Sequence, residues 1–254
     1  MVRFVHDQTI LGVATNNRLY YRSGLDKYWG AAPNFGSGLL GIAVTIDGRL
    51  LGIGLDRKLY IRESLDKGWK KLPDRTGVLY GLCVTRDNIV YCIGRDRKIW
   101  SHKLDNFAKH SWVRSPDKGG WIKGISVHKC GRIYAVGAND QLFTRENLSA
   151  AWRSTPKKNI GVTDCCVTKD CTLIGIGPDK KLWSRGPNLN QPWKRETRRT
   201  QFNIISISTH PWTGCPDPSK PQKPIAPPTP PEDDSGNDDA TNQPEVDDEE
   251  LEKP

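Results

Sequence analysis

The chain has 254 residues, among them 24 glycines and 18 prolines, and only 36% of its residues are hydrophobic. This length allows one large all-β domain or two smaller domains. No apolar run approaches the ~18 residues that a membrane span needs. Residues 1–7 lack the apolar stretch of a secretory signal peptide. We therefore expect a cytoplasmic protein by default, or an extracellular one exported by a non-classical route or after removal of a leader.

The charge is divided unevenly along the chain. Residues 216–254 hold 12 acidic residues, 3 lysines and 10 of the prolines, a net charge of −9, whereas residues 1–215 carry a net charge of +18. Low hydrophobicity, proline and like charge together oppose folding. We therefore predict a basic domain over 1–215 and a disordered, proline-rich acidic tail over 216–254. The tail either competes with an anionic ligand for the basic domain or only keeps the protein soluble.

One short motif recurs five times in the predicted domain. Its aromatic anchors lie 40, 40, 43 and 40 residues apart: Tyr20, Tyr60, Trp100, Phe143 and Trp183. A tryptophan follows each anchor: Trp29, Trp69, Trp112, Trp152 and Trp193. The repeat units span about 1–40, 41–80, 81–123, 124–163 and 164–209. Repetition at this period is typical of propellers and solenoids.

Each unit contains strand signals and no helix signal. In the second unit we expect strands over 42–45, 51–54 and 59–62 and a fourth that begins at Trp69, and the other units follow the same order. Four short strands in ~40 residues are typical of a propeller blade. The pattern predicts an all-β, five-bladed propeller, with an open solenoid as the alternative. Either residues 203–208 or residues 1–5 supply the innermost strand of the first blade and close the ring.

The motif Trp69-x-x-Leu72-Pro73…Gly81-Leu-Cys-Val…Ile93-Gly94-x-Asp96-x-x-Ile99-Trp100 resembles the tectonin repeat, and the resemblance covers residues 1–209. It implies a β-propeller lectin that binds cell-surface glycans, including lipopolysaccharide and methylated sugars, in innate recognition or agglutination. That family usually has six shorter units, whereas this chain has five longer ones. With five blades, the chain is also similar to tachylectin-type propellers, but the sugar-site sequence of that type does not occur here.

Two repeated positions are candidate ligand contacts. The tryptophans of the units, foremost Trp29, Trp69, Trp152 and Trp193, either pack against the neighbouring blade or offer a face on which a sugar ring stacks. A basic residue follows each aromatic anchor by two positions: Arg22, Arg62, Arg145 and Arg185, with His102 in the third unit. These arginines either bind carbonyl groups of a neighbouring blade or form a ring of sites for hydroxyl or phosphate groups.

A third candidate is the turn before each aromatic anchor. The propeller fold would place these turns on one rim, where their cations would form a basic crown: Arg18, Arg57, Lys58, Arg97, Lys98, Lys180 and Lys181. The cations are either solvated hairpin tips or an anion-binding surface. Lipopolysaccharide phosphates and sulfated glycans are the candidate ligands. Nucleic acid is less favoured, because no known RNA- or DNA-binding motif occurs.

The seven cysteines give one candidate disulfide. If Asp87-Asn88 is a two-residue hairpin turn, Cys83 faces Cys92 closely enough for a disulfide, although two buried thiols would also fit. Cys130 and Cys171 lie in equivalent turns of adjacent units. No Cys-x-x-Cys motif has a matching partner, so we expect no zinc site.

No catalytic signature or cofactor motif occurs in the sequence. We therefore predict a non-enzymatic, multivalent lectin without a cofactor, whose partners are glycans or lipopolysaccharide and which does not insert into membranes. The alternative is a protein–protein interaction scaffold that uses the propeller rim and the acidic tail. A lectin of this kind needs equivalent sites in several blades, whereas a scaffold needs one singular surface.

Overall fold

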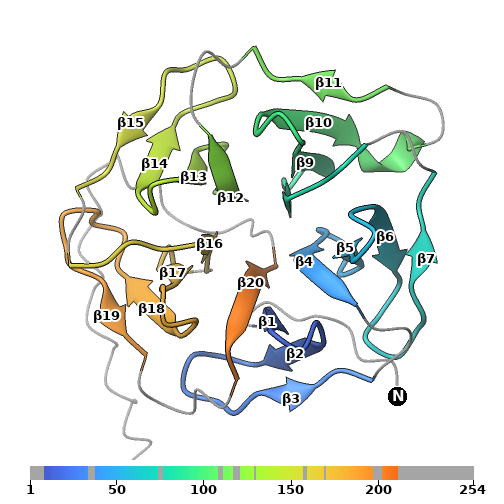
Figure 1. The fold of residues 1–254 in the computed structure, drawn as a ribbon, viewed down its shortest axis with the longest axis horizontal. Helices are drawn as coiled ribbons and strands as arrows, with labels where there is room; N and C mark the ends of the chain where they lie inside the picture. Colours follow the sequence, from blue (N-terminus) through green and yellow to red (C-terminus); the bar gives the residue numbers. More distant parts are fainter. Residues whose placement is uncertain are drawn as a thin grey trace, which may run out of the picture. The chain divides into compact units, whose positions relative to one another are not determined.

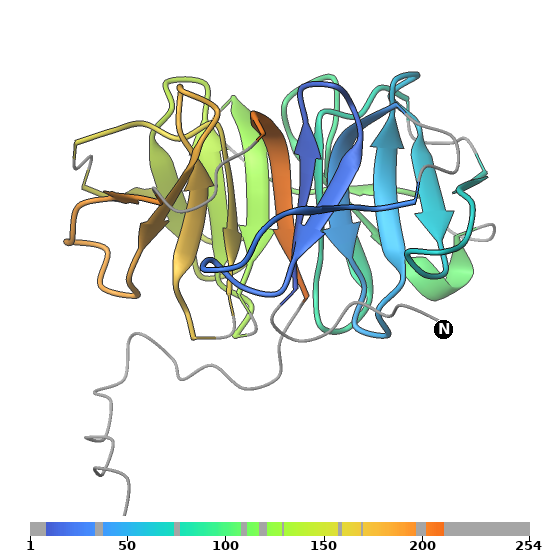
Figure 2. The same cartoon turned by 90° about the horizontal axis from the view of Figure 1, so that it is seen from below.

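The structure is a computed structural model that describes residues 9–33, 38–73, 77–107, 111–116, 121–128, 130–156, 159–168, 170–196 and 202–210. These residues form five four-stranded antiparallel sheets, arranged as the blades of a propeller ring (Figures 1 and 2). The predicted fold class is confirmed. Residues 1–5 and the predicted tail over 216–254 lie outside the described ranges. Within those ranges, no helix has the length and apolar character needed to cross a bilayer.

The strands follow the same order in every blade, from the centre outward. Blade 1 contains β20 (Ile204–Thr209), β1 (Ile10–Ala14), β2 (Leu19–Arg22) and β3 (Gly30–Ala31), and blade 2 contains β4 (Leu39–Val44), β5 (Leu50–Gly54), β6 (Leu59–Arg62) and β7 (Lys70–Lys71). Blade 3 contains β8 (Gly81–Val84), β9 (Ile89–Ile93), β10 (Ile99–Lys103) and β11 (Val113–Arg114), with a 3₁₀ helix, η1 (Leu104–Asn106), after β10. Blade 4 contains β12 (Ile122–Val127), β13 (Ile133–Gly137), β14 (Leu142–Arg145) and β15 (Arg153–Ser154). Blade 5 contains β16 (Asp164–Val167), β17 (Leu173–Ile176), β18 (Leu182–Arg185) and β19 (Lys194–Arg195).

The ring is closed by the last described strand. β20 pairs with β1 in antiparallel fashion, with Ile10 opposite Thr209 and Gly12 opposite Ile207. Residues 203–208, rather than residues 1–5, therefore supply the innermost strand of blade 1. This closure leaves β1 without a free inner edge and joins the two ends of the repeat array.

The hydrophobic core lies between the blades. Strands such as β1, β5 and β13 are buried along their whole length, because each face of a blade packs against a neighbour. Five apolar clusters result, one at each interface between adjacent blades. At the interface of blades 2 and 3, for example, Leu51 and Ile53 pack with Val90 and Cys92.

The predicted pairing of Cys83 with Cys92 is wrong by one residue. Cys83 faces Tyr91, and Cys92 faces Leu82. The turn contains three residues rather than two: the N–H of Thr85 donates to the carbonyl of Ile89, and Asn88 between them has a φ of 54°. The one-residue shift turns the two thiols toward opposite neighbouring blades, and both cysteines are free. Burial raises the pKa of both thiols.

Candidate ligand-binding face

The repeated arginines lie inside the blade interfaces. Arg22, Arg62, Arg145 and Arg185 are each at least 98% buried. Each guanidinium lies over the tryptophan of its own blade, 4.3 to 5.6 Å from the ring centroid. In blade 3, the ring of His102 takes this place, 5.1 Å from that of Trp112. Burial lowers the pKa of Arg22 to about 10.

Two of these arginines also donate to carbonyl groups of the preceding blade. Nη2 of Arg62 donates to the carbonyl of Pro33 at 3.2 Å, and Nη2 of Arg185 donates to the carbonyl of Pro156 at 3.2 Å. These are the carbonyl contacts that one of the two sequence interpretations expects. A ligand could reach the guanidinium groups only if the blades separated.

The repeated tryptophans pack on the second strand of their own blade. Trp29 and Trp193 are buried, while Trp69, Trp112 and Trp152 are half-buried. The ring of Trp69 lies so close to Gly52 that a Cβ atom there would be 3.0 Å from it. A Cβ atom at Gly12 or Gly175 would likewise lie too close to the ring of Trp29 or Trp193. The glycine of the repeat motif thus makes room for the tryptophan, and the ring serves packing.

In three of the five turns before the aromatic anchors, the first position is an aspartate with a structural role. Asp56 accepts hydrogen bonds from the N–H of Lys58 at 3.1 Å and from the hydroxyl of Tyr60 at 2.9 Å, and it forms an ion pair with Lys71 at 2.8 Å. Asp96 and Asp179 bind the anchor tryptophan and an outer-strand arginine of their blades in the same arrangement. These carboxylates neutralise cations on the outer strands of the blades.

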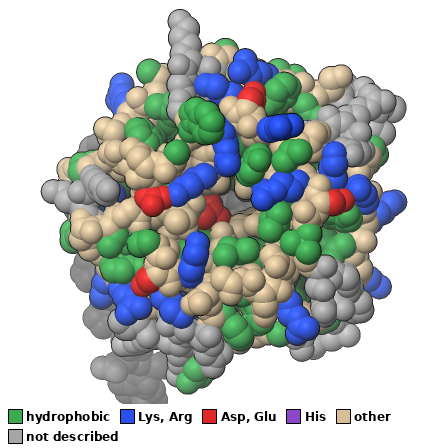
Figure 3. Space-filling view, viewed as in Figure 1, with side chains coloured by type: hydrophobic (Ala, Val, Ile, Leu, Met, Phe, Trp, Pro, Cys, Tyr) green, Lys and Arg blue, Asp and Glu red, His purple; other side chains and the backbone are tan. Residues whose placement is uncertain are grey.

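The turns that carry the predicted basic crown lie on one face of the ring. In four blades the carbonyl of the second turn residue accepts an N–H from the start of the next blade at 2.9 to 3.1 Å; these residues are Asn17, Arg57, Asp140 and Lys180. Figure 2 shows the β1–β2 turn at the upper edge of the ring, the face that Figure 3 views. Figure 3 shows Lys and Arg side chains around a central hollow on this face, with fewer Asp and Glu side chains.

Four of these cations form a central cluster. The guanidinium carbon atoms of Arg57 and Arg97 lie 4.5 and 3.8 Å from the ring centroid of one tyrosine, Tyr80. Burial, followed by the charges of Lys180 and Arg97, lowers the pKa of Lys123. Lys123 also forms an ion pair with Asp140. We call Arg57, Arg97, Lys123 and Lys180 the central basic cluster.

The backbone at three of these cations is unfavourable for a long side chain. Arg57, Arg97 and Lys180 have φ values of 58°, 59° and 60°. Glycine and asparagine accept this left-handed conformation more easily, and for other residues it costs roughly 1–2 kcal/mol. Blade 1 has Asn17 at the equivalent position. Blade 4 has Asp140 there with a φ of 62°, so the turn imposes this conformation whichever side chain it carries.

Three residues of this face were not predicted from the sequence: Tyr80, Lys123 and Trp121. Tyr80 and Lys123 directly precede the glycine that starts the inner-strand motif of their units, Gly81 and Gly124. Tyr80 contacts Arg57 of the preceding blade and Arg97 of its own blade, and Lys123 pairs with Asp140 of its own blade. Trp121 is 71% exposed, although it adjoins a buried strand. Its place outside the repeated tryptophan position is the sequence feature that could have marked Trp121 as a candidate.

The central channel offers little space for a ligand. The inner strands of all the blades line a cavity of about 30 Å³, which holds about two water molecules and excludes a sugar ring. Within the described part of the chain, no group of three His, Cys, Asp or Glu side chains is arranged to hold a metal ion. The basic face is therefore the stronger candidate for ligand binding.

Comparison with known proteins supports the fold alone. No protein-family model matches the sequence, and no curated protein is similar to it. A chain in the structure described as "Crystal structure of Nidogen/Laminin Complex" is similar, with a TM-score of 0.57 and 12% identity over 81% of this chain and 82% of that one. A chain of "YCF48 bound to D1 peptide" has a TM-score of 0.45 and 14% identity, over 78% of this chain and 68% of that one.

Proposed function

We propose that this chain is a non-enzymatic lectin of the tectonin type that binds glycans carrying sulfate or phosphate groups on its basic face. The observation that carries the proposal is the meeting of Arg57 and Arg97 on Tyr80. Stacking on one ring orients both guanidinium groups before a ligand arrives, which reduces the entropy lost on binding. Planar guanidinium groups match the paired oxygens of sulfate and phosphate.

The surroundings of this pair suit a charged sugar. Lys123 and Lys180 add positive charge near Arg97, and the carboxylates of Asp140 and Asp164 adjoin Lys123. Trp121 offers an exposed aromatic face, which can stack on the C–H face of a sugar ring. Because the repeated Arg side chains are buried in the blade interfaces and the repeated Trp rings pack against them, we place binding at this one face. The proposed lectin thus has one site instead of the several equivalent sites expected from the sequence.

The test is binding of the full chain to an array of neutral, sulfated and phosphorylated glycans and lipopolysaccharide at low and high salt. We then compare Arg57→Asn/Arg97→Asn with the parent chain by calorimetry. This variant copies the turn of blade 1 at Asn17, so it should fold as well as the parent. Hydrogen bonds to charged groups contribute about 1.5–3 kcal/mol each, so loss of both arginines should weaken binding at least 100-fold.

The matched control removes the same charge elsewhere. Lys70 and Arg153 are exposed on the outer strands β7 and β15, and Lys70→Gln/Arg153→Gln should change affinity by less than about threefold if binding is local. Equal losses in both variants would show that only the overall charge attracts the ligand. Binding of neutral glycans that high salt does not weaken would refute the assignment to this face.

A protein-binding scaffold is the second candidate, and the singular character of the basic face favours it. A single surface without copies in every blade is what a scaffold needs. Absence of glycan binding at both salt concentrations, together with capture of a protein partner that Arg57→Asn/Arg97→Asn abolishes, would favour this alternative.

A further inference from the structure

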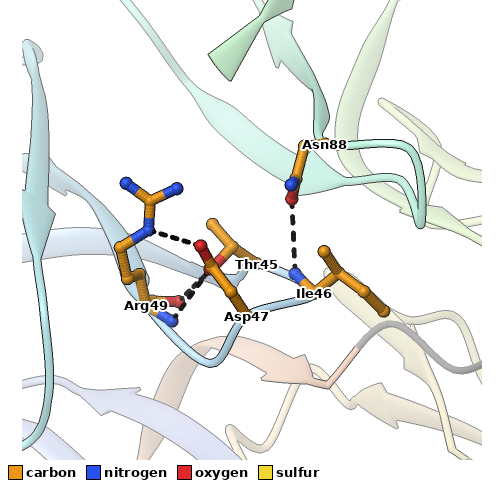
Figure 4. Close-up of polar contacts among 5 residues, drawn as sticks. All are labelled: Thr45, Ile46, Asp47, Arg49 and Asn88. Carbon is orange, nitrogen blue, oxygen red and sulfur yellow. Dashed lines mark hydrogen bonds and ion pairs between the residues drawn. The ribbon is translucent and has the colours of Figure 1, made fainter. Parts of the chain in front are cut away.

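The opposite face of the ring carries a second repeated turn, between the innermost and the second strand of a blade. In blade 2, the hydroxyl of Thr45 donates to the carboxylate of Asp47, and Nε of Arg49 donates to the same carboxylate at 2.8 Å (Figure 4). Burial alone would raise the pKa of Asp47, but the hydrogen bond from Thr45 and the charge of Arg49 lower it. This turn therefore favours a negative charge at its third position.

Blade 5 repeats the arrangement. There the hydroxyl of Thr168 donates to the carboxylate of Asp170, which also accepts a hydrogen bond from the hydroxyl of Thr172 at 3.1 Å. Despite burial, these hydrogen bonds lower the pKa of Asp170. The preference for an anion at the third position is thus a property of the turn and is not limited to one blade.

Blade 4 has different residues in the same turn: His128 replaces the threonine and Cys130 replaces the aspartate. Nδ1 of His128 lies 2.8 Å from Sγ of Cys130. The backbone N–H of Cys130 points at the same nitrogen, at 3.2 Å. A backbone N–H can only donate, so Nδ1 is an acceptor and carries no proton. The thiol proton of Cys130 therefore has a basic nitrogen in front of it.

The other side of the imidazole is held by the neighbouring blade. Sγ of Cys171 in blade 5 lies 3.5 Å from Nε2 of His128, so Nε2 carries the ring proton and directs it at that sulfur. Cys171 has a φ of 62°, as Asn88 has in blade 3 with 54°. Asn88 also reaches the turn of the preceding blade, where it accepts the N–H of Ile46 at 3.4 Å (Figure 4).

Three further groups adjoin this cluster. Arg132, the counterpart of Arg49, is bound to the carboxylate of Glu146 at 3.1 Å. Burial raises the pKa of Tyr134 to about 12, so its phenol stays neutral beside Cys130 and Cys171. A base, a nucleophile and a group that orients the base are together the arrangement of an activated nucleophile.

Among the cysteines of the described ranges, Cys130 is the exposed one and the others are buried. We propose that Cys130 is a thiol-modification site at which His128 is the base and a small-molecule disulfide, such as oxidised glutathione, is the reagent. The Cys130 thiol gives its proton to Nδ1 of His128, and the sulfur attacks one sulfur of the reagent. A new S–S bond forms, the S–S bond of the reagent breaks, and the leaving thiolate takes the proton from the imidazolium.

The test follows mixed-disulfide formation in the full chain by mass spectrometry after addition of oxidised glutathione. A Cys215→Ser background removes the thiol that lies outside the described ranges. We expect one glutathione per chain, on the peptide that contains Cys130, and none in Cys130→Ala. In His128→Asn the rate at about pH 7 should fall roughly tenfold, and the difference should vanish near pH 9.5, where thiols ionise without a base.

His128→Thr is the second variant, because it restores the residue that blades 2 and 5 have in this turn. A hydroxyl fits the turn but does not take up the thiol proton, so the rate should fall as in His128→Asn. Modification of another cysteine first, or an unchanged rate in His128→Thr, would overturn the proposal. The parent chain gives an independent criterion: its rate should fall less than tenfold from pH 8 to 6, against roughly 80-fold for a solvated thiol.

Discussion

Replacing Asp164 with asparagine should make the stability of the ring less dependent on pH. Asp164 begins the innermost strand of blade 5, at a position where blades 2, 3 and 4 have glycine. Its carboxylate accepts the N–H of Cys165 at 2.9 Å and, across the blade interface, the N–H of Ile207 at 3.1 Å. Burial outweighs these hydrogen bonds and raises the pKa of Asp164 from 3.8 to about 7.

The magnitude follows from this shift. Between pH 4 and pH 7 the folded protein keeps the Asp164 proton and the unfolded chain has lost it, so the free energy of unfolding decreases as the pH rises. Each pKa unit corresponds to about 1.4 kcal/mol, which gives at most about 4 kcal/mol. The residue is half-buried rather than buried, so water screens part of this penalty and we expect a change of about 2 to 4 kcal/mol.

The assay is urea unfolding of the parent and Asp164→Asn chains at about pH 4.5, 6 and 8. All other titratable groups are shared, so their contributions cancel in the difference between the two chains. That difference should shift in favour of Asp164→Asn by about 2 to 3 kcal/mol from the lowest to the highest pH, because part of the effect is already present at pH 4.5. The loss of an acceptor in asparagine adds a constant offset and does not affect the slope. Parallel pH profiles for the two chains would refute the reasoning.

Three further changes test the ring itself. Arg62→Ala removes the contacts to Trp69 and Pro33 and should lower the free energy of unfolding by about 2–4 kcal/mol, measured by urea titration. Gly52→Ala places a Cβ atom 2.8 Å from Leu39 and 3.0 Å from Trp69 and should cost about 1–3 kcal/mol in the same assay; no loss would show that both side chains can move aside. Truncation before residue 202 removes β20, and loss of cooperative thermal unfolding in calorimetry is expected because β1 is left as an open edge; an unchanged transition would contradict the closure.

The repeat determined the fold class, because five units with one strand pattern can bury their faces only by stacking on one another. It did not determine register inside each hairpin. The difference between a two-residue and a three-residue turn moved Cys83 and Cys92 to opposite faces of blade 3. The longer turn requires the left-handed φ of Asn88. The same sequence also fits the shorter turn, so the turn length is set by the tertiary structure and not by the local sequence.

The sequence also could not separate structural repeats from binding residues. Regular recurrence singled out arginines such as Arg62 and tryptophans such as Trp69, yet recurrence is also what an interface between identical blades requires. These side chains are buried because each of the five interfaces between blades needs equivalent residues to fill it. The surface clusters combine both kinds of residue: Arg57 and Arg97 stand at a recurring turn position, whereas Tyr80 and Cys130 break the pattern.

By itself, the sequence determined the number of blades, the order of strands and the closing strand as one of two choices, since hydrophobic alternation and period are local properties. Only the tertiary structure decided which residues meet. Arg57 and Arg97 come from different blades and converge on Tyr80, and His128 meets Cys171 across an interface. Such contacts depend on how the ring brings neighbouring turns together, and no spacing along the chain encodes that distance.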